Sequence, residues 1–250
     1  MTPVEIPGLD LPSQWMNAAG SLGFAPAAGQ PLPAPLGLFV TNAISLAPRR
    51  AAEAAQLLEF PGGVLLHSGL PNPGLSAALK KHASAWKRGE VPIIVHLLAQ
   101  SPEELRKMTL RVEGLENVLA LEIGIPADAS ASLVSELCQA GRGELPCIAQ
   151  LPLTRALELC DAALQAGAAA ISLGPARGSL PAAGGRLVSG RLYGPAQLPQ
   201  ALEATRQLAR QSLPVIAAGG VYSPADGEAL LAAGAMGVQV DAGLWKASAF

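Results

Sequence analysis

Charge is scarce in this chain. Only 14% of its 250 residues are charged, against about 25% in an average soluble domain. The 17 basic and 19 acidic residues leave a net charge of −2, so the positive excess that marks a nucleic-acid-binding surface is missing. Half of the residues are hydrophobic, which excludes an intrinsically disordered chain. We therefore expect a folded protein that binds no nucleic acid.

Cysteines and long apolar runs are also lacking. Cys138, Cys147 and Cys160 are too few for a disulfide framework and do not have the spacing of metal ligands, so we expect no metal site and a reducing, cytoplasmic environment. No apolar run reaches the length of about 18 residues that a membrane-spanning helix needs, and the first residues lack the basic segment of a signal peptide. These absences predict a protein without a membrane partner.

Short apolar runs alternate with helical patterns along the chain. Eight runs bounded by glycine or proline are typical of buried parallel strands: 37–41, 63–67, 92–96, 118–123, 147–151, 169–173, 214–218 and 237–241. Ser101 and Ser223 each precede a proline and are predicted N-caps. A weaker helical pattern covers 49–58. This alternation predicts an α/β fold, a (β/α)8 TIM barrel that forms a single domain over residues 1–250.

Two segments do not follow the alternation. Residues 1–36 are rich in proline and glycine and are predicted to form an irregular N-terminal segment that closes the barrel bottom or wraps one side. Residues 174–195 form a predicted loop of a length that is usually functional or disordered. It contains Arg177, Arg186 and Arg191, which could bind a phosphate or an acidic substrate. Each of them, taken singly, is explained equally well as a solvated surface arginine.

The functional residues of such a barrel lie where its strands end. His67 and His96 are at the ends of adjacent predicted strands; either could transfer protons near neutral pH or only line the pocket. Glu122 is more simply an inward-facing barrel residue than a general base. Gly219-Gly220 and Ala242-Gly243 follow the last two predicted strands, where barrels often bind phosphate. A charge such as Asp241 would oppose that phosphate by about 1–4 kcal/mol.

Several segments occur in the order found in the dihydroorotate dehydrogenases. They are Met16–Gly20, Phe39–Asn42, His67–Gly74, Leu121–Ile123, Ser189–Pro195 and the stretch from Gly219-Gly220 to Gly243. The chain therefore resembles this family of FMN-dependent (β/α)8 enzymes of pyrimidine biosynthesis from about residue 11 to residue 245. The resemblance implies an oxidoreductase that binds FMN and forms a homodimer.

The resemblance also implies roles for individual residues. Ala18, Ala19 and Gly20 would border the FMN ring or its linker, and Asn42 and Gln150 would also lie at the cofactor. The ribityl phosphate would be held by the small residues Gly190, Gly219, Gly220, Ala242 and Gly243. The substrate would be bordered by Gly69, Leu70 and Asn72.

The sequence departs from the family at the positions that are catalytic there. The family usually has lysines where Asn42 and Gln150 stand, and an asparagine and a Cys or Ser base after the fourth strand, where residues 121–128 have neither. A positioned base contributes about 10²–10⁴-fold to a rate, so these losses predict little oxidation of dihydroorotate and leave the substrate open. Two alternatives remain: a non-catalytic barrel that acts as a binding or scaffold protein, and a flavin-free barrel that binds a phosphorylated ligand.

Overall fold

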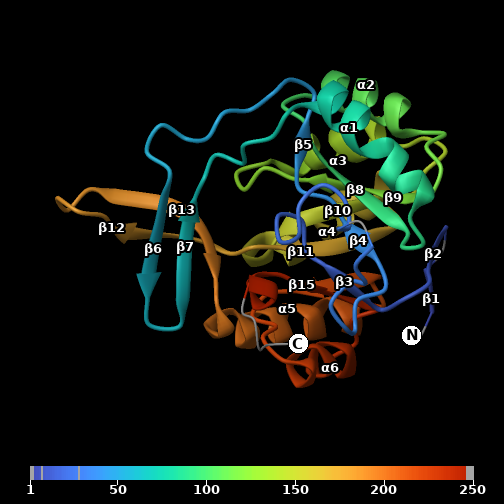
Figure 1. Cartoon of the computed structure of the whole chain (residues 1–250). Helices are drawn as coiled ribbons and strands as arrows, with labels where there is room; N and C mark the ends of the chain where they lie inside the picture. Colours follow the sequence, from blue (N-terminus) through green and yellow to red (C-terminus); the bar gives the residue numbers. More distant parts are fainter. Residues whose placement is uncertain (1–2, 7, 28, 246–250) are drawn as a thin grey trace.

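A parallel barrel with helices around it forms the body of the molecule (Figure 1). The structure is a computed structural model that describes residues 3–6, 8–27 and 29–245. Every paired neighbour in the barrel is parallel, which confirms the predicted (β/α)8 fold. The strand order is β3 (Trp15–Asn17), β15 (Gly237–Val240), β14 (Val215–Ala218), β11 (Ala170–Gly174), β10 (Cys147–Pro152), β9 (Val118–Gly124), β8 (Ile93–Leu98) and β4 (Phe39–Val40).

A side chain closes this barrel. Its end strands, β3 and β4, are joined by a single backbone bridge between Met16 and Leu38. Asn17 adds to that pairing, because its amide donates to the Val40 carbonyl oxygen at 2.7 Å and its Oδ1 accepts from the Val40 N–H at 2.9 Å. The buried amide therefore supplies a donor and an acceptor where the ladder between the two strands ends.

The helices lie largely where the sequence predicts them: α1 (Leu75–Arg88), α2 (Pro102–Val112), α3 (Ala131–Ala140), α4 (Ala156–Gln165), α5 (Leu198–Arg210) and α6 (Pro224–Ala232). Ser101 and Ser223 are the N-caps of α2 and α6 and accept from Glu104 N–H and Asp226 N–H. The helix predicted over 49–58 is absent; a loop over 49–55 and the first residues of β6 (Gln56–Phe60) occupy this region, after the short strand β5 (Ile44–Ser45). Among the described residues, no helix is long and apolar enough to cross a membrane.

The assignment of the first two barrel strands was wrong. The first barrel strand, β3, lies inside the N-terminal segment that the sequence predicts as irregular, and 37–41 contains the second barrel strand rather than the first. The same segment also contains a hairpin of β1 (Val4–Ile6) and β2 (Leu9–Leu11). Ile6, Leu9 and Leu11 belong to the buried cluster inside the barrel. This hairpin therefore closes the N-terminal end of the barrel.

Residues 63–67 form a strand, but they do not belong to the barrel. This strand, β7 (Gly63–His67), lies in an antiparallel sheet with the order β12 (Arg177–Pro181), β13 (Leu187–Tyr193), β7 and β6. The sheet stands at one side of the barrel (Figure 1). The predicted loop 174–195 is thus a hairpin, which turns at Gly184-Gly185 with both residues at positive φ. Two glycines flanked by alternating residues are a hairpin signal in the sequence.

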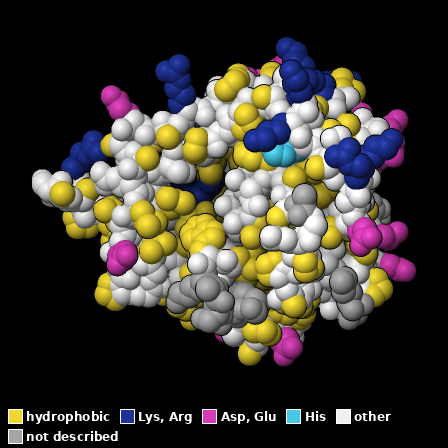
Figure 2. Space-filling model, viewed as in Figure 1, with side chains coloured by type: hydrophobic (Ala, Val, Ile, Leu, Met, Phe, Trp, Pro, Cys, Tyr) yellow, Lys and Arg dark blue, Asp and Glu magenta, His cyan; other side chains and the backbone are white. Residues whose placement is uncertain are grey.

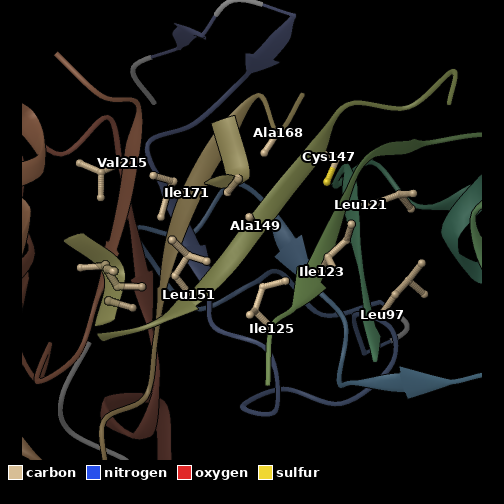
Figure 3. Close-up of a cluster of buried hydrophobic side chains, with 14 of the residues drawn as sticks. Leu97, Leu121, Ile123, Ile125, Cys147, Ala149, Leu151, Ala168, Ile171 and Val215 are labelled. Carbon is tan, nitrogen blue, oxygen red and sulfur yellow. The ribbon is translucent and has the colours of Figure 1, made fainter. Parts of the chain in front are cut away.

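Two apolar layers surround the barrel strands. Outward-facing residues such as Leu121, Ile123 and Ala149 pack in the cluster between the strands and the helices (Figure 3). Inward-facing residues such as Ile94 and Ile148 form the smaller interior cluster. Since side chains alternate along a strand, the next inward-facing positions lie two residues further on, nearer the C-terminal end. Those positions are polar, and they form the floor of the site.

Candidate functional site

A buried carboxylate organises the polar layer inside the barrel. Glu122 accepts hydrogen bonds from the Ser172 hydroxyl and the Gln239 amide at Oε1, each at 2.6 Å. Its Oε2 lies 2.6 Å from His96 Nδ1 and 3.3 Å from the Gln150 amide nitrogen. These side chains come from β8, β9, β10, β11 and β15. Side chains from four other strands therefore converge on one carboxylate, which is fully buried.

The hydrogen bonds keep this carboxylate charged. Burial alone raises the pKa of Glu122, but the bonds and charge of His96 and the bonds from Ser172 and Gln239 outweigh it, so that the pKa lies below its ordinary value of 4.5. When the imidazole of His96 is neutral, the charged carboxylate accepts from its Nδ1–H and so favours the tautomer whose Nε2 carries no proton. Nε2 lies beside Gly124, where an added Cβ would be only 2.8 Å away. The lack of a side chain at position 124 therefore leaves space for the imidazole.

A cavity lies above the polar layer, at the C-terminal ends of the strands. It has about 970 Å³ of empty space, part of it open to solvent. Its floor includes His96, Gln150 and Gln239 from the barrel, and its opposite wall includes Leu66 and Tyr193 from the antiparallel sheet. Figure 2 shows a hollow between this sheet and the barrel. The arrangement combines an apolar enclosure with a few converging polar groups, as expected of a small-molecule site.

Two oxygen atoms of this cavity wall lack a partner. Gln239 Oε1 and Asp241 Oδ1 are buried and accept no hydrogen bond from the described residues. Burial raises the pKa of Asp241 to about 6, although the backbone N–H groups of Ala242 and Gly243 hydrogen-bond its carboxylate and oppose the shift. Buried acceptors without partners are costly, so both atoms indicate a ligand that donates hydrogen bonds.

The structure brings eight of the predicted site residues together in the lining of the cavity. They are Ala18, Ala19, Gly20, Asn42, Leu70, His96, Gln150 and Gly219. The Asn42 side chain also has a structural role, since its Oδ1 accepts a hydrogen bond from Gly23 N–H at 3.1 Å. The other seven lie outside this lining: His67, Gly69, Asn72, Gly190, Gly220, Ala242 and Gly243.

His67 is not beside His96 at the end of a barrel strand, as the sequence predicted. It lies at the end of β7 in the antiparallel sheet, and its Nδ1 is 2.9 Å from the Ser189 carbonyl oxygen. The error has a simple cause, because the adjacency depended on 63–67 being a barrel strand. Asn72 likewise has a local role: its Oδ1 accepts from the N–H groups of Ser45 and Gly74.

Close packing against a neighbouring backbone segment requires a glycine at three of the predicted positions, Gly69 at the substrate and Gly190 and Gly220 at the phosphate. An added Cβ at Gly190 would lie 2.6 Å from the Leu66 carbonyl oxygen, and one at Gly69 would lie 2.7 Å from Ala52 N. Gly220 has φ +77° and would bring a Cβ within 2.3 Å of Leu198 N. Each glycine is therefore required by a neighbouring backbone segment.

Comparison with known proteins now identifies the family. The family model described as dihydroorotate dehydrogenase matches residues 1–136. Two relatives, from Trichlorobacter lovleyi and Desulforudis audaxviator, are 30% and 31% identical over 259 and 266 residues. The alignments cover 95% and 96% of this chain and 85% of each relative, and both relatives are named catalytic subunits of dihydroorotate dehydrogenase B (NAD(+)). This chain belongs to the dihydroorotate dehydrogenase family.

A solved structure supports the same fold. The dihydroorotate dehydrogenase of Eimeria tenella, crystallised in complex with ferulenol, matches with a TM-score of 0.75 at 15% identity. The match covers 95% of this chain and 78% of that protein. Family membership therefore agrees with the barrel built above from its strands.

Sequence reasoning missed three residues that shape the site of this family member. Gln239 and Tyr193 line the cavity, and the Gln239 amide also donates a hydrogen bond to Glu122. Gln239 lies on the last strand and Asp241 directly follows that strand, two residues further on, so alternation could have placed both side chains inside the barrel. Tyr193 could not have been found in this way, because it reaches the cavity through the antiparallel sheet. Arg49, the third, lines an adjoining cavity.

Proposed function

We propose that this member of the dihydroorotate dehydrogenase family is an FMN-dependent oxidoreductase in which His96 accepts a proton from a small-molecule substrate. The buried pair of His96 and Glu122 at the cavity floor is the observation that carries the proposal. A base whose tautomer is set by a carboxylate, and which borders a substrate-sized cavity, is suited to general base catalysis. Membership of the family supports the oxidoreductase class.

The residues of the cavity fit most of an FMN molecule. Ala18, Ala19 and Gly20 line one side with little side-chain volume, and nothing lies within 4 Å of a Cβ built on Gly20, which suits a flat ring. The unpartnered oxygens of Gln239 and Asp241 can accept from the ribityl hydroxyls. The phosphate end fits less well, because Asp241 already engages the N–H groups of Ala242 and Gly243 and carries a charge above pH 6.

The cofactor and the cavity residues would have distinct roles in this reaction. Bound FMN supplies the acceptor for a hydride. His96 takes a proton at Nε2 while Glu122 holds Nδ1–H and stabilises the imidazolium that results. Leu66, Leu70 and Tyr193 line the cavity with apolar surface and would exclude water around a bound ligand, which strengthens the electrostatic interactions there. His96 thereby performs the task of the Cys or Ser base that residues 121–128 lack.

Purified protein tests the cofactor directly. We expect a yellow protein, or a colourless one that binds added FMN and quenches its fluorescence. A protein that is colourless and ignores FMN would refute the proposal. FMN binding is best measured at pH 5.5 as well as at pH 8, because Asp241 carries less charge at the lower pH and so opposes the phosphate less.

His96→Gln tests the role of the base. Glutamine can still donate to Glu122, but it cannot accept a proton, so we expect flavin reduction by substrate to slow by about 10²–10⁴-fold. Dihydroorotate is the first substrate to try, and stopped-flow absorbance of the flavin measures the rate. FMN affinity should change little, because the variant retains the polar floor of the cavity.

His67→Gln is the matched control for this variant. Its side chain contacts the Ser189 carbonyl oxygen outside the cavity, so reduction should proceed at the wild-type rate. Equal rates for His96→Gln and wild type, or an equal loss in both variants, would contradict the assignment of His96.

A flavin-free binding protein is the second candidate function. The specific observation in its favour is the Asp241 carboxylate, which accepts from the two backbone N–H groups where the resemblance implies a phosphate. Under this reading, FMN would leave the unfolding temperature unchanged, whereas a ligand rich in hydrogen-bond donors would raise it.

The assembly of the active protein is also a proposal. Relatives are named as catalytic subunits of an NAD(+)-linked enzyme, which supports electron transfer to a second type of subunit. The homodimer implied by the sequence resemblance is compatible with this arrangement. Sedimentation of the purified chain tests for the homodimer. Sedimentation after addition of the second type of subunit tests for a complex of the two subunits.

A further inference from the structure

Three arginines converge beside the cavity that would hold the flavin. Arg177 on β12 lies directly opposite Arg191 on β13 in the antiparallel ladder. Arg49 is held nearby through a backbone bridge to Asn72, with its N–H 2.9 Å from the Asn72 carbonyl oxygen. All three line a second cavity with about 710 Å³ of empty space, which includes space open to solvent. Figure 2 shows Lys or Arg atoms recessed in the hollow between the sheet and the barrel.

No carboxylate of the described residues forms an ion pair with these arginines, of which Arg49 and Arg177 are exposed to solvent and Arg191 is partly buried. No Asp or Glu lines the second cavity. The described ion pairs use Lys87, His96, Arg155 and Arg206 as their cationic partners, and none uses these arginines. Like charges directly opposite one another destabilise a strand pair. Burial lowers the pKa of Arg191, and the charges of Arg177 and Arg49 lower it further against the opposing effect of Tyr193.

The second cavity opens onto the first. Arg191, Gln150, Leu70 and Pro175 line both. A molecule whose reacting carbon lies above the polar floor can therefore extend toward the three guanidinium groups. Each guanidinium can bind a carboxylate through two parallel hydrogen bonds.

We propose that Arg49, Arg177 and Arg191 form a subsite for the acidic end of the substrate, and that the substrate is a small dicarboxylate. That the bound dicarboxylate is a substrate rests on the proposed function, but its binding to the subsite does not require a flavin. Three cationic groups without an acidic partner match two negative charges better than one. The subsite would thus favour a dicarboxylate over a monocarboxylate of similar size.

Binding to the full chain without flavin tests the proposal. Calorimetry at low ionic strength with fumarate and succinate should show binding that weakens as salt is added. Crotonate, with one carboxylate, should bind at least tenfold more weakly than fumarate. Arg177→Gln and Arg191→Gln should each weaken fumarate binding at least tenfold.

Arg186→Gln is the matched control. Arg186 is exposed near the turn of the same hairpin and lines neither of the two cavities, so fumarate should bind as in wild type. Arg177→Gln also removes the repulsion across the ladder, and its thermal unfolding temperature without ligand should equal or exceed that of wild type. A folded variant therefore remains available even if Arg191→Gln does not fold.

Several outcomes would overturn the subsite. Fumarate binding no tighter than crotonate, or unchanged in Arg177→Gln, contradicts it. Inorganic phosphate binding where fumarate does not would assign the arginines to a phosphate group. FMN binding that falls in both arginine variants while fumarate binding does not would assign them to the cofactor. Arginine-dependent fumarate binding by a protein that ignores FMN would keep the subsite and refute the proposed function.

Discussion

Asp241→Asn should stabilise the protein by about 3 kcal/mol at pH 8 and by well under 1 kcal/mol at pH 4. Asp241 is buried, and its pKa in the folded protein is about 6 against an ordinary 3.8. That difference corresponds to about 3 kcal/mol. Since the folded state binds the proton more tightly than the unfolded state, the charged carboxylate costs stability in full above about pH 6. The cost disappears as the pH falls from about 6 to below 4.

Urea unfolding at pH 8, 6 and 4 measures this effect. Asp161→Asn on α4 is the control, because Asp161 is exposed and its loss should change stability by less than about 0.5 kcal/mol at each pH. A stability difference for Asp241→Asn that does not depend on pH would show that the carboxylate is not the source of the cost.

Asp241 should also affect how tightly the phosphate of FMN binds. Removal of one charge about 4 Å from a phosphate is worth about 1–4 kcal/mol, so Asp241→Asn should bind FMN at least about fivefold more tightly at pH 8. Asp241→Ala also frees the N–H groups of Ala242 and Gly243 and should bind FMN more tightly still. Fluorescence titration with FMN and with riboflavin separates the phosphate effect, since riboflavin affinity should change much less.

Glu122→Ala should destabilise the protein by about 3–5 kcal/mol at pH 7. Removal of one partner from a buried charged pair costs about this amount, and the donors of His96, Ser172 and Gln239 would all lose their acceptor. The pKa of Glu122 lies below 4.5 in the folded state, so its contribution is complete at neutral pH and is lost as the pH falls below 4.5. The difference between variant and wild type should therefore shrink in acid.

Glu158→Ala provides the comparison for a surface pair. Glu158 on α4 pairs with Arg155, the residue just before this helix, and is mostly exposed, so its loss should cost at most about 1 kcal/mol. Chemical unfolding of both variants at pH 7 gives the two values. A loss for Glu122→Ala as small as that for Glu158→Ala would mean that water replaces the carboxylate, and the network would then have little part in holding His96.

Local sequence patterns determined most individual elements of this protein. Ser101 before Pro102 marks the start of α2, and Gly141 marks the end of α3, because caps and glycines act on the nearest few residues. Seven of the predicted strands overlap barrel strands, and residues 63–67 are a strand with the predicted bounds. The predicted strand ends also placed His96, Gln150 and Gly219 at the cavity, and the family resemblance placed Ala18–Gly20 there.

Only the tertiary structure decided which strands pair and what the side chains meet. An apolar run has the same local pattern whether its partner is a parallel barrel strand or an antiparallel hairpin, so 63–67 was placed in the barrel and Trp15–Asn17 was overlooked. The consequences extend to the site: His67 moved away from His96, and the hairpin brought Arg177, Arg191 and Tyr193 over the cavity. Pairing depends on backbone groups distant in sequence, and the charge and partners of Glu122 and Asp241 depend on burial, which exists only once those distant segments have come together.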